Sequence, residues 1–492
     1  MKRFLLVGLA LSAIVSVGAS ENADDQAIVH VLNRIGYGAR AGDVERVRAL
    51  GVQRYIDQQL HPERVPDPGM AARLEGLTTV RMSSAEIASD IERPLTEARR
   101  ARKQQASSDT QASPPPPDPV QQKANSVVVE LSEQKLLRAI YSERQLEEVL
   151  ADFWFNHFNV DARKGRDRFL LTEYERETIR PHLLGKFHDL LGATAKSPAM
   201  LFYLDNWMSA DPDGPHLEMR PARVVRGPFG GRVFVPASAR PQPQGKNAPK
   251  GLNENYGREL MELHTLGVDG GYTQKDVTEV ARAFTGWTIA NPQRGGGFRF
   301  EARLHDPGEK VVLGHVIKAG GGESDGEQVL DILAKHPSTA KFIATKLARR
   351  FVGDAPPPAL VERVAKRFRD TEGDLREVTR AILTSPEFLA PAAHGTKVKT
   401  PFEFVVSALR ASGAEVSDAR PLVRELQQLG MPLYMCQPPT GYADSADAWV
   451  NAGALVNRMN FAVRLAGDKI RGVTDATQPA ALSLGSPEFQ KK

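Results

Sequence analysis

Apolar residues recur every three or four positions along most of this chain, which is the spacing of helices that bury one face. Residues 44–50 form one such segment between Asp43 and Gly51, and residues 52–60 form the next. A glycine directly after a periodic run is typical of a helix end. The same pattern returns throughout the sequence, and it predicts a mainly α-helical, large multi-helix protein.

Several of these segments begin with a pair of residues typical of a helix N-terminus. In a capping box, a Ser or Thr side chain accepts a hydrogen bond from the backbone three residues later, and the side chain there bonds back. Proline favours the first position of a helix because its missing N–H is not needed there. The predicted starts are Ser142 with Gln145, Thr273 with Asp276, Ser324 with Glu327, Asp374 with Glu377, and Pro358.

Strand patterns are confined to short stretches. Phe298, Phe300 and Ala302 alternate with charged residues, and the turn sequence 306–309 separates them from the apolar residues 311–313. Alternation before a turn and a β-branched apolar run after it predict a β-hairpin. Residues 232–235 predict another short strand. The fold should therefore contain one or two small β-hairpins.

Two segments are rich in residues that disfavour regular structure. Residues 101–124 contain a proline run and are composed as a flexible insertion, and residues 211–251 form a long loop rich in Gly, Pro and Arg. Long loops in compact proteins are either functional or disordered. We expect residues 27–465 to form a single large helical domain or two lobes of one, followed by a tail over residues 466–492.

The first residues have the pattern of a secretory signal. Lys2 and Arg3 precede an apolar run over residues 4–15, and small residues follow at 17–20. The run is shorter than the roughly 20 residues that span a bilayer. We expect residues 1–20 to be a signal peptide for the general secretory route, because no Arg-Arg pair is present. The mature chain should be periplasmic or extracellular and have no transmembrane span.

Charge and cysteine usage narrow the picture further. The 492 residues carry a net charge of +4, and the charges are interspersed. This mild balance and the predicted export argue against a nucleic-acid partner. The single cysteine, Cys436, cannot form an intrachain disulfide, so the hydrophobic core must hold the fold.

Residues 253–267 contain the densest set of chemically active side chains. On a regular helix, Glu254, Arg258 and Glu262 are spaced to form a ladder of ion pairs. His264 would point about 140° away from Glu259, so this helix alone does not present the Glu-x-x-His face of a metal site. The ladder is either a solvated surface or the wall of a cleft. The candidate catalytic residues are Glu254, Arg258, Glu259 and Glu262.

Other candidates lie outside that segment. His157 continues an apolar helical stripe and is either a core histidine or a metal or acid/base residue, and His305 stands at the predicted hairpin turn. Both are candidate metal ligands. Asp205, Asn206 and Trp207 end a predicted helix before the long loop; they either cap it or bind substrate in the same cleft as Glu254.

Standard catalytic signatures do not settle the question. No His-Glu-x-x-His metalloprotease motif occurs, and no Gly-rich phosphate loop follows a predicted strand. The sequence identifies no cofactor, and it leaves open whether the protein is an enzyme.

Six stretches together resemble a bacterial exported family catalogued as a domain of unknown function, number eighteen hundred. The stretches are residues 30–38, 153–160, 253–267, 276–287, 341–352 and 451–461. The resemblance implies export, and it implies genes that often lie beside those of a sulfatase-like exported family. It implies no activity, catalytic residue or cofactor.

Two hypotheses remain. In the first, the protein is a non-catalytic envelope protein that binds or helps to assemble another exported protein, of the sulfatase-like type. In the alternative, it is an exported hydrolase or modifying enzyme that acts on an envelope or extracellular polymer with carboxylate acid/base residues. Convergence of the glutamates of residues 254–262 with His157 in one cleft would favour the alternative.

Overall fold

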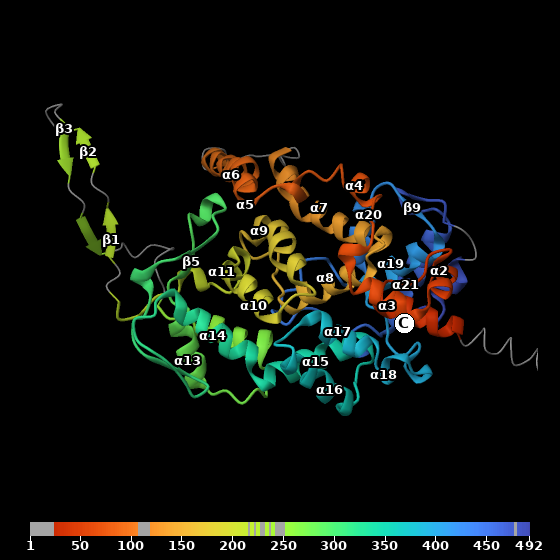
Figure 1. Ribbon diagram of the computed structural model, residues 1–492. Coiled ribbons are helices and arrows are strands. Elements are labelled where there is room, and N and C mark those ends of the chain that lie inside the picture. Colours follow the sequence, from red (N-terminus) through yellow and green to blue (C-terminus); the bar gives the residue numbers. More distant parts are fainter. Residues whose placement is uncertain are drawn as a thin grey trace, which may run out of the picture.

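The computed structural model confirms a mainly α-helical protein (Figure 1). It describes residues 24–106, 119–214, 217–220, 223–226, 232–235, 238–241, 251–476 and 480–492. The expected signal peptide, residues 1–20, lies outside these ranges. Within them, no helix is both long enough and apolar enough to cross a membrane.

The N-terminal third is a series of short helices that leads into a long one. A first helix covers residues 24–35. It is followed by α2 (Asp43–Leu50), α3 (Val52–Gln59), α4 (Met70–Arg73), α5 (Ser84–Ile87), the π-helical turn η3 (Ala88–Glu92), α6 (Arg93–Ala106) and α7 (Pro119–Tyr141). The two helices predicted on either side of Gly51 are thus confirmed. Both ends of the expected insertion 101–124 belong to α6 and α7.

The middle third contributes several of the helices near the centre of the molecule (Figure 1). Its helical elements are α8 (Gln145–His157), α9 (Asp167–Glu173), η4 (Tyr174–Ile179), α10 (Phe187–Lys196), α11 (Pro198–Tyr203), α12 (Glu254–Glu259), η7 (Leu260–Thr265) and α13 (Gln274–Ala283). The packing of α12 on α13 requires Gly257, because a Cβ there would lie 2.8 Å from the carbonyl oxygen of Val277. A larger residue would push the two helices apart.

The C-terminal third closes the other side of the core. Its helices are α14 (Glu323–Lys335), α15 (Pro337–Phe351), α16 (Pro358–Asp370), α17 (Leu375–Leu383), α18 (Pro386–Leu389), α19 (Pro401–Ser412), α20 (Arg420–Gln428), α21 (Ala452–Ala466) and α22 (Ala480–Gly485). One continuous hydrophobic cluster extends from Ile28 to Leu484, and it includes the fully buried Trp154 of α8. A smaller cluster lies where α6 meets α7.

The structure separates the true helix starts from the false ones. Thr273 and Asp276 form a complete capping box at α13, and Asp374 caps α17. Two predicted boxes are wrong. The helix α8 is capped at Arg144 without a side-chain hydrogen bond, and α14 begins one residue before Ser324, after Gly322.

The strands form two-stranded antiparallel pairs, and the predicted hairpin has different partners from those expected. β6 (Phe298–Phe300) pairs with β5 (Trp287–Ile289), and β7 (Lys310–Val312) pairs with β8 (His315–Ile317). Both predicted strands exist, but pairing them with each other is wrong. β6 and β7 each pair with a different short strand nearby in the chain. These partner strands have too few alternating residues to be recognised from sequence. A further pair joins β9 (Glu415–Val416) to β10 (Val473–Thr474).

The long loop 211–251 carries two nested pairs among its described residues. β1 (Leu217–Arg220) pairs with β4 (Ser238–Pro241), and between them β2 (Arg223–Arg226) pairs with β3 (Arg232–Val235). The strand predicted at residues 232–235 is confirmed. Figure 1 shows the two pairs as an arm that projects from the helical body beyond β5.

Candidate functional site

A cleft opens between the end of α8, the π-helical turn η7, α15 and the segment 440–444. Its volume is about 280 Å³. Apolar side chains form most of its wall, among them Phe153, Leu263 and Phe342, and Val268 stands at its edge with 70 % exposure. A small set of polar groups converges on it: Asn156, His157, Glu262, Lys346, Arg349 and Asp444. Apolar walls with a few converging polar groups are typical of ligand sites.

His157 lies at the base of this cleft with both ring nitrogens engaged. Its Nε2 is 3.1 Å from the carbonyl oxygen of His264, and its Nδ1 is 2.9 Å from Nζ of Lys346. A carbonyl only accepts, so Nε2 must carry the proton, and Nδ1 then accepts from the lysine. Burial lowers the pKa of His157 well below its usual value, and the positive charge of Lys346 lowers it further. The imidazole is therefore neutral.

Lys346 is the most unusual ionisable group of the cleft. Its pKa is lowered to about 8, mainly by burial and next by the charge of Arg349, and Asp444 opposes this shift. An amine with a pKa of about 8 gains and loses a proton close to neutral pH, as a general acid or base must. The contact with His157 fixes the direction of the amine. The lysine is thus both positioned and electrostatically prepared for proton transfer.

The acidic side of the cleft comes from two separate segments. Glu262 of η7 accepts a hydrogen bond from the hydroxyl of Tyr272, at 3.1 Å. Asp444 forms an ion pair with Lys397 at 2.9 Å. Its segment is held by Asn156, whose amide donates to the carbonyl of Tyr442 at 2.8 Å and accepts from the Tyr442 backbone N–H at 2.7 Å.

Gly441 is required for this anchoring. Its φ is 74°, and a Cβ would lie 2.2 Å from the carbonyl oxygen of Asn156. Any other residue would push segment 440–444 away from α8 and widen the cleft.

The predicted catalytic arc of residues 254–262 is divided by a change of helix type. Because η7 is a π-helix, side chains after Glu259 are rotated away from the positions of a regular helix. Glu262 lines the cleft with His157, whereas Glu254 turns to α13 and accepts hydrogen bonds from Gln274 and Thr278 at 2.9 Å each.

The predicted ladder of ion pairs does not form. Arg258 donates to Gln274 at 2.7 Å, and it pairs with neither Glu254 nor Glu262 in the described part of the chain. Glu259 is half-buried. Burial raises the pKa of its carboxyl, and the negative charge of the nearby Glu262 raises it further.

The predicted substrate-binding residues form a turn that holds a neighbouring strand. Asn206 is fully buried, and its amide nitrogen is 3.1 Å from the carbonyl of Phe284 and 3.2 Å from that of Trp287. Asp205 forms an ion pair with Lys164, and Trp207 stacks on Phe202. A hydrogen bond joins this turn to the start of α12, because the side-chain amide of Asn253 donates to the carbonyl of Leu204 at 2.7 Å. They do not line the cleft of His157.

His305, the second candidate metal ligand, lies in a different cluster. Its Nδ1 is 2.9 Å from the carbonyl of Thr285, and its Nε2 is 3.1 Å from a carboxylate oxygen of Asp325. Lys310 donates to the same oxygen at 2.7 Å, and both Lys310 and Asp325 are fully buried. Within the described ranges, no three His, Cys, Asp or Glu side chains are grouped closely enough to hold a metal ion.

Residues 322–326 also have the Gly-x-Ser-x-Gly spacing of a nucleophile elbow. In such an elbow the serine needs a histidine within hydrogen-bonding reach. Here Ser324 is exposed and donates to the carbonyl of Gly321 at 2.9 Å, while both nitrogens of His305 are engaged elsewhere. The motif forms the start of α14 and places Asp325 in the buried cluster.

Sequence reasoning missed Lys346, Arg349 and Asp444, which complete the cleft. Lys346 lies on a helix with apolar residues on one face and three other cations along its length, so its pattern is that of a surface helix. Only the contact with α8, almost two hundred positions earlier, distinguishes it.

Comparison with known proteins places the chain in one family. The chain matches the model of that family, described as a protein of unknown function (DUF1800), over residues 30–490. No curated protein and no solved structure matches it. Because the match covers nearly the whole chain, this protein belongs to the DUF1800 family.

Proposed function

We propose that the protein is an exported enzyme that carries out acid–base chemistry in the cleft of His157, with Lys346 as the group that moves the proton. The contact between Lys346 and His157 carries this proposal, because it joins a fixed geometry to an amine with a pKa of about 8. Of the glutamates of residues 254–262, Glu262 alone lines the cleft with His157, and this partial convergence supports an enzyme.

The proposed chemistry uses the groups in distinct ways. The neutral amine of Lys346 accepts a proton from a substrate hydroxyl or an attacking water, and His157 holds the amine in place through its Nδ1. Arg349 keeps the amine acidic enough to release the proton again. Glu262 and Asp444 accept hydrogen bonds from substrate hydroxyls at the cleft wall.

The size and walls of the cleft suggest the substrate class. A volume of about 280 Å³ accommodates one unit of a polymer or a small molecule. Aromatic walls next to carboxylates suit a ring that carries hydroxyl groups. An envelope or extracellular polymer with such units is the substrate class that we propose.

The test is turnover of a panel of chromogenic esters and glycosides by the mature protein. We expect activity that rises with pH around 8, because Lys346 must be unprotonated to act as a base. Lys346→Met should abolish it, and Lys341→Met should not, since Lys341 lies on the same helix but pairs with Glu362 at the surface. Equal turnover by Lys346→Met and the unmodified protein, including none by either, would overturn the proposal.

Export by the general secretory route is part of the same proposal and rests on the N-terminal pattern. Mass spectrometry of the protein recovered from the periplasm and the medium should find a mature N-terminus close to residue 21. A protein that keeps residues 1–20 in the cytoplasm would refute it.

A second function, docking to another exported protein, is supported by α21. Leu455, Val456, Met459 and Val463 are 40 %, 55 %, 54 % and 58 % exposed on this helix. Arg458, the one charged residue in 451–463, is buried, so the outer face is uncharged. Exposed apolar surface of this kind is common at protein interfaces. The resemblance to the family suggests the sulfatase-like exported protein as the partner.

Co-purification from envelope extracts tests this second function. The unmodified protein should recover the sulfatase-like protein, identified by mass spectrometry, and the double variant Val456→Asp, Met459→Asp should lose it. Asn457→Asp, which adds a charge to the same helix at a polar position, is the control. Recovery that is unchanged in the double variant would exclude α21 as the interface.

A further inference from the structure

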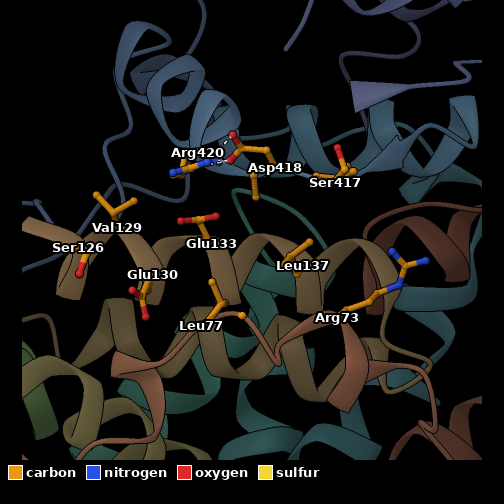
Figure 2. A pocket seen from close by; sticks show the side chains of 13 residues that line it. Arg73, Leu77, Ser126, Val129, Glu130, Glu133, Leu137, Ser417, Asp418 and Arg420 are labelled. Atoms are coloured by element: carbon orange, nitrogen blue, oxygen red, sulfur yellow. Dashed lines mark hydrogen bonds and ion pairs between the residues drawn. The ribbon is translucent and has the colours of Figure 1, made fainter. Parts of the chain in front are cut away.

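A second hollow, larger than the cleft of His157, lies along α7 and shares no lining residue with that cleft. Its volume is about 600 Å³, and it runs between α7, the turn 73–77 and the segment 416–420 (Figure 2). Leu77, Val129 and Leu137 give it apolar walls. Figure 2 shows the carboxyl group of Glu133 rising from α7 into this groove, towards the segment that carries Asp418 and Arg420.

The other charged side chains of the groove are already paired. Arg420 binds Asp418 with two nitrogens, at 2.8 and 2.9 Å (Figure 2). Arg73 pairs with Glu415 at 2.7 Å and lies over the ring of Tyr141. Glu130 accepts hydrogen bonds from the backbone N–H and the hydroxyl of Thr79, at 2.7 and 2.8 Å.

Glu133 is the exception. It is only 8 % exposed, yet within the described ranges it has no hydrogen bond and no ion pair. Burial raises its pKa to about 7; the charge of Arg420 lowers the pKa, and those of Asp418 and Glu130 raise it. A buried carboxylate without a partner is costly, and a bound cation would recover part of that cost.

We propose that the groove along α7 is a binding site for an organic cation, a primary ammonium on a short aliphatic chain, with the carboxylate of Glu133 as its partner. The ammonium donates to Glu133, and the aliphatic chain packs on Leu77, Val129 and Leu137. One free carboxylate with apolar walls does not provide the several oxygen ligands that a metal ion needs. The site is separate from the cleft of His157 and independent of the proposed acid–base activity.

The pH dependence of binding follows from the same geometry. Only ionised Glu133 attracts the cation. The pKa of Asp418 is lowered by its hydrogen bond with Arg420, and the pKa values of Arg420 and Arg73 are raised, so these groups keep their charges around neutral pH. Glu130 also faces the groove and is hydrogen-bonded to Thr79. With a pKa of about 7, the ionised fraction of Glu133 rises about tenfold between pH 6 and pH 8. The affinity for an ammonium should rise by the same factor.

The experiment is titration of the mature protein with n-butylammonium, followed by NMR, with 1-butanol as the uncharged probe of equal shape. We expect binding of the amine that strengthens about tenfold from pH 6 to pH 8, and no comparable binding of the alcohol. Glu133→Gln should weaken binding at pH 8 at least tenfold, whereas the exposed Glu97→Gln should not change it.

Glu133→Gln should fold normally, because it removes an unpaired buried charge, and a thermal melt checks this. Equal binding of amine and alcohol, binding by Glu133→Gln as strong as that of the unmodified protein, or no binding of the amine at pH 8 would each overturn the proposal.

Discussion

Asn206 shows at the scale of one residue how a side chain that resembles a ligand-binding group serves the fold. Its amide reaches the carbonyls of Phe284 and Trp287 from a buried position, so it joins the turn after α11 to the strand β5. A buried carbonyl without a donor costs about 1–3 kcal/mol. Polar residues that end a helix before a loop can therefore face the protein interior and stabilise the fold instead of binding a ligand.

We therefore predict that Asn206→Ala lowers the free energy of unfolding by about 1–3 kcal/mol, because the carbonyls of Phe284 and Trp287 lose the amide donor, while that of Phe284 keeps the backbone N–H of Trp287. Asp205→Asn is the matched control. Asp205 has a φ of 58°, which asparagine tolerates, and it would lose only a partly exposed ion pair with Lys164. Denaturant unfolding of both variants measures the difference. Equal losses would mean that the buried amide is not what stabilises this turn.

At the scale of elements, the capping pairs show how far local sequence determines a helix start. Thr273 and Asp276 occupy the predicted positions, and the carboxylate of Asp276 also accepts from the backbone of Leu313 at 2.8 Å. Ser324 and Glu327 have the same spacing, but the helix has already begun at Glu323. The burial of Asp325 beside Lys310 and His305 outweighs the local preference of Ser324 for the capping position.

This difference predicts unequal effects of equal substitutions. Thr273→Ala removes a real cap and should cost about 1 kcal/mol, whereas Ser324→Ala removes only an exposed hydrogen bond and should cost a few tenths. Thermal melts of the two variants test the prediction. A loss at Ser324 as large as that at Thr273 would show that the Gly-x-Ser-x-Gly turn contributes more than its contacts indicate.

For the strands, the local sequence predicts the element but not its partner. Residues 298–300 show the alternation of a strand and residues 310–312 overlap a β-branched apolar run, and both form strands. Alternation defines which face of a strand is buried, but it does not specify the partner. The partners, residues 287–289 and 315–317, lack the longer alternation that residues 298–303 show, so no periodic signal marks them in the sequence.

At the scale of the whole molecule, burial of basic side chains makes stability depend on pH. The pKa of His30 is lowered to about 3, mainly by burial and next by the positive charge of Arg34. The pKa of His264 is also lowered to about 3, mainly by burial. A histidine in the unfolded chain has a pKa of about 6.5. The unfolded state therefore binds more protons below that pH, so the stability that each neutral histidine contributes is complete above pH 6.5 and is lost as the pH falls.

Glu133 and Asp167 act in the opposite sense, since burial raises the pKa of both carboxyls. The contribution of one histidine must therefore be measured as a difference. We predict that His30→Gln, which can still donate to the carbonyl of Phe388, has a free energy of unfolding that changes less steeply with pH. Between pH 6 and pH 4 the difference in slope should be about 1.4 kcal/mol per pH unit. Parallel curves for the two proteins would contradict the neutral, buried state of His30.

By itself, the sequence determined the mainly α-helical class, the helices on either side of Gly51, two of the capping pairs and the strand at residues 232–235. These features depend on neighbours two to four positions away, and a sequence shows such neighbours directly. The family resemblance, carried by six stretches, was confirmed over residues 30–490. Of the candidate site residues, the sequence put forward both His157 and Glu262, which the structure brings into one cleft.

Only the tertiary structure decided which polar residues meet. The helical wheel of residues 253–267 assumed a regular helix, and the π-helical turn from Leu260 placed Glu262 in the cleft but left Arg258 outside it. Lys346 meets His157, and Arg350 meets Glu403 and, through it, Lys492, across separations that no local pattern records. Such contacts depend on how whole helices pack, and packing is set by the shape of the entire core rather than by any one segment.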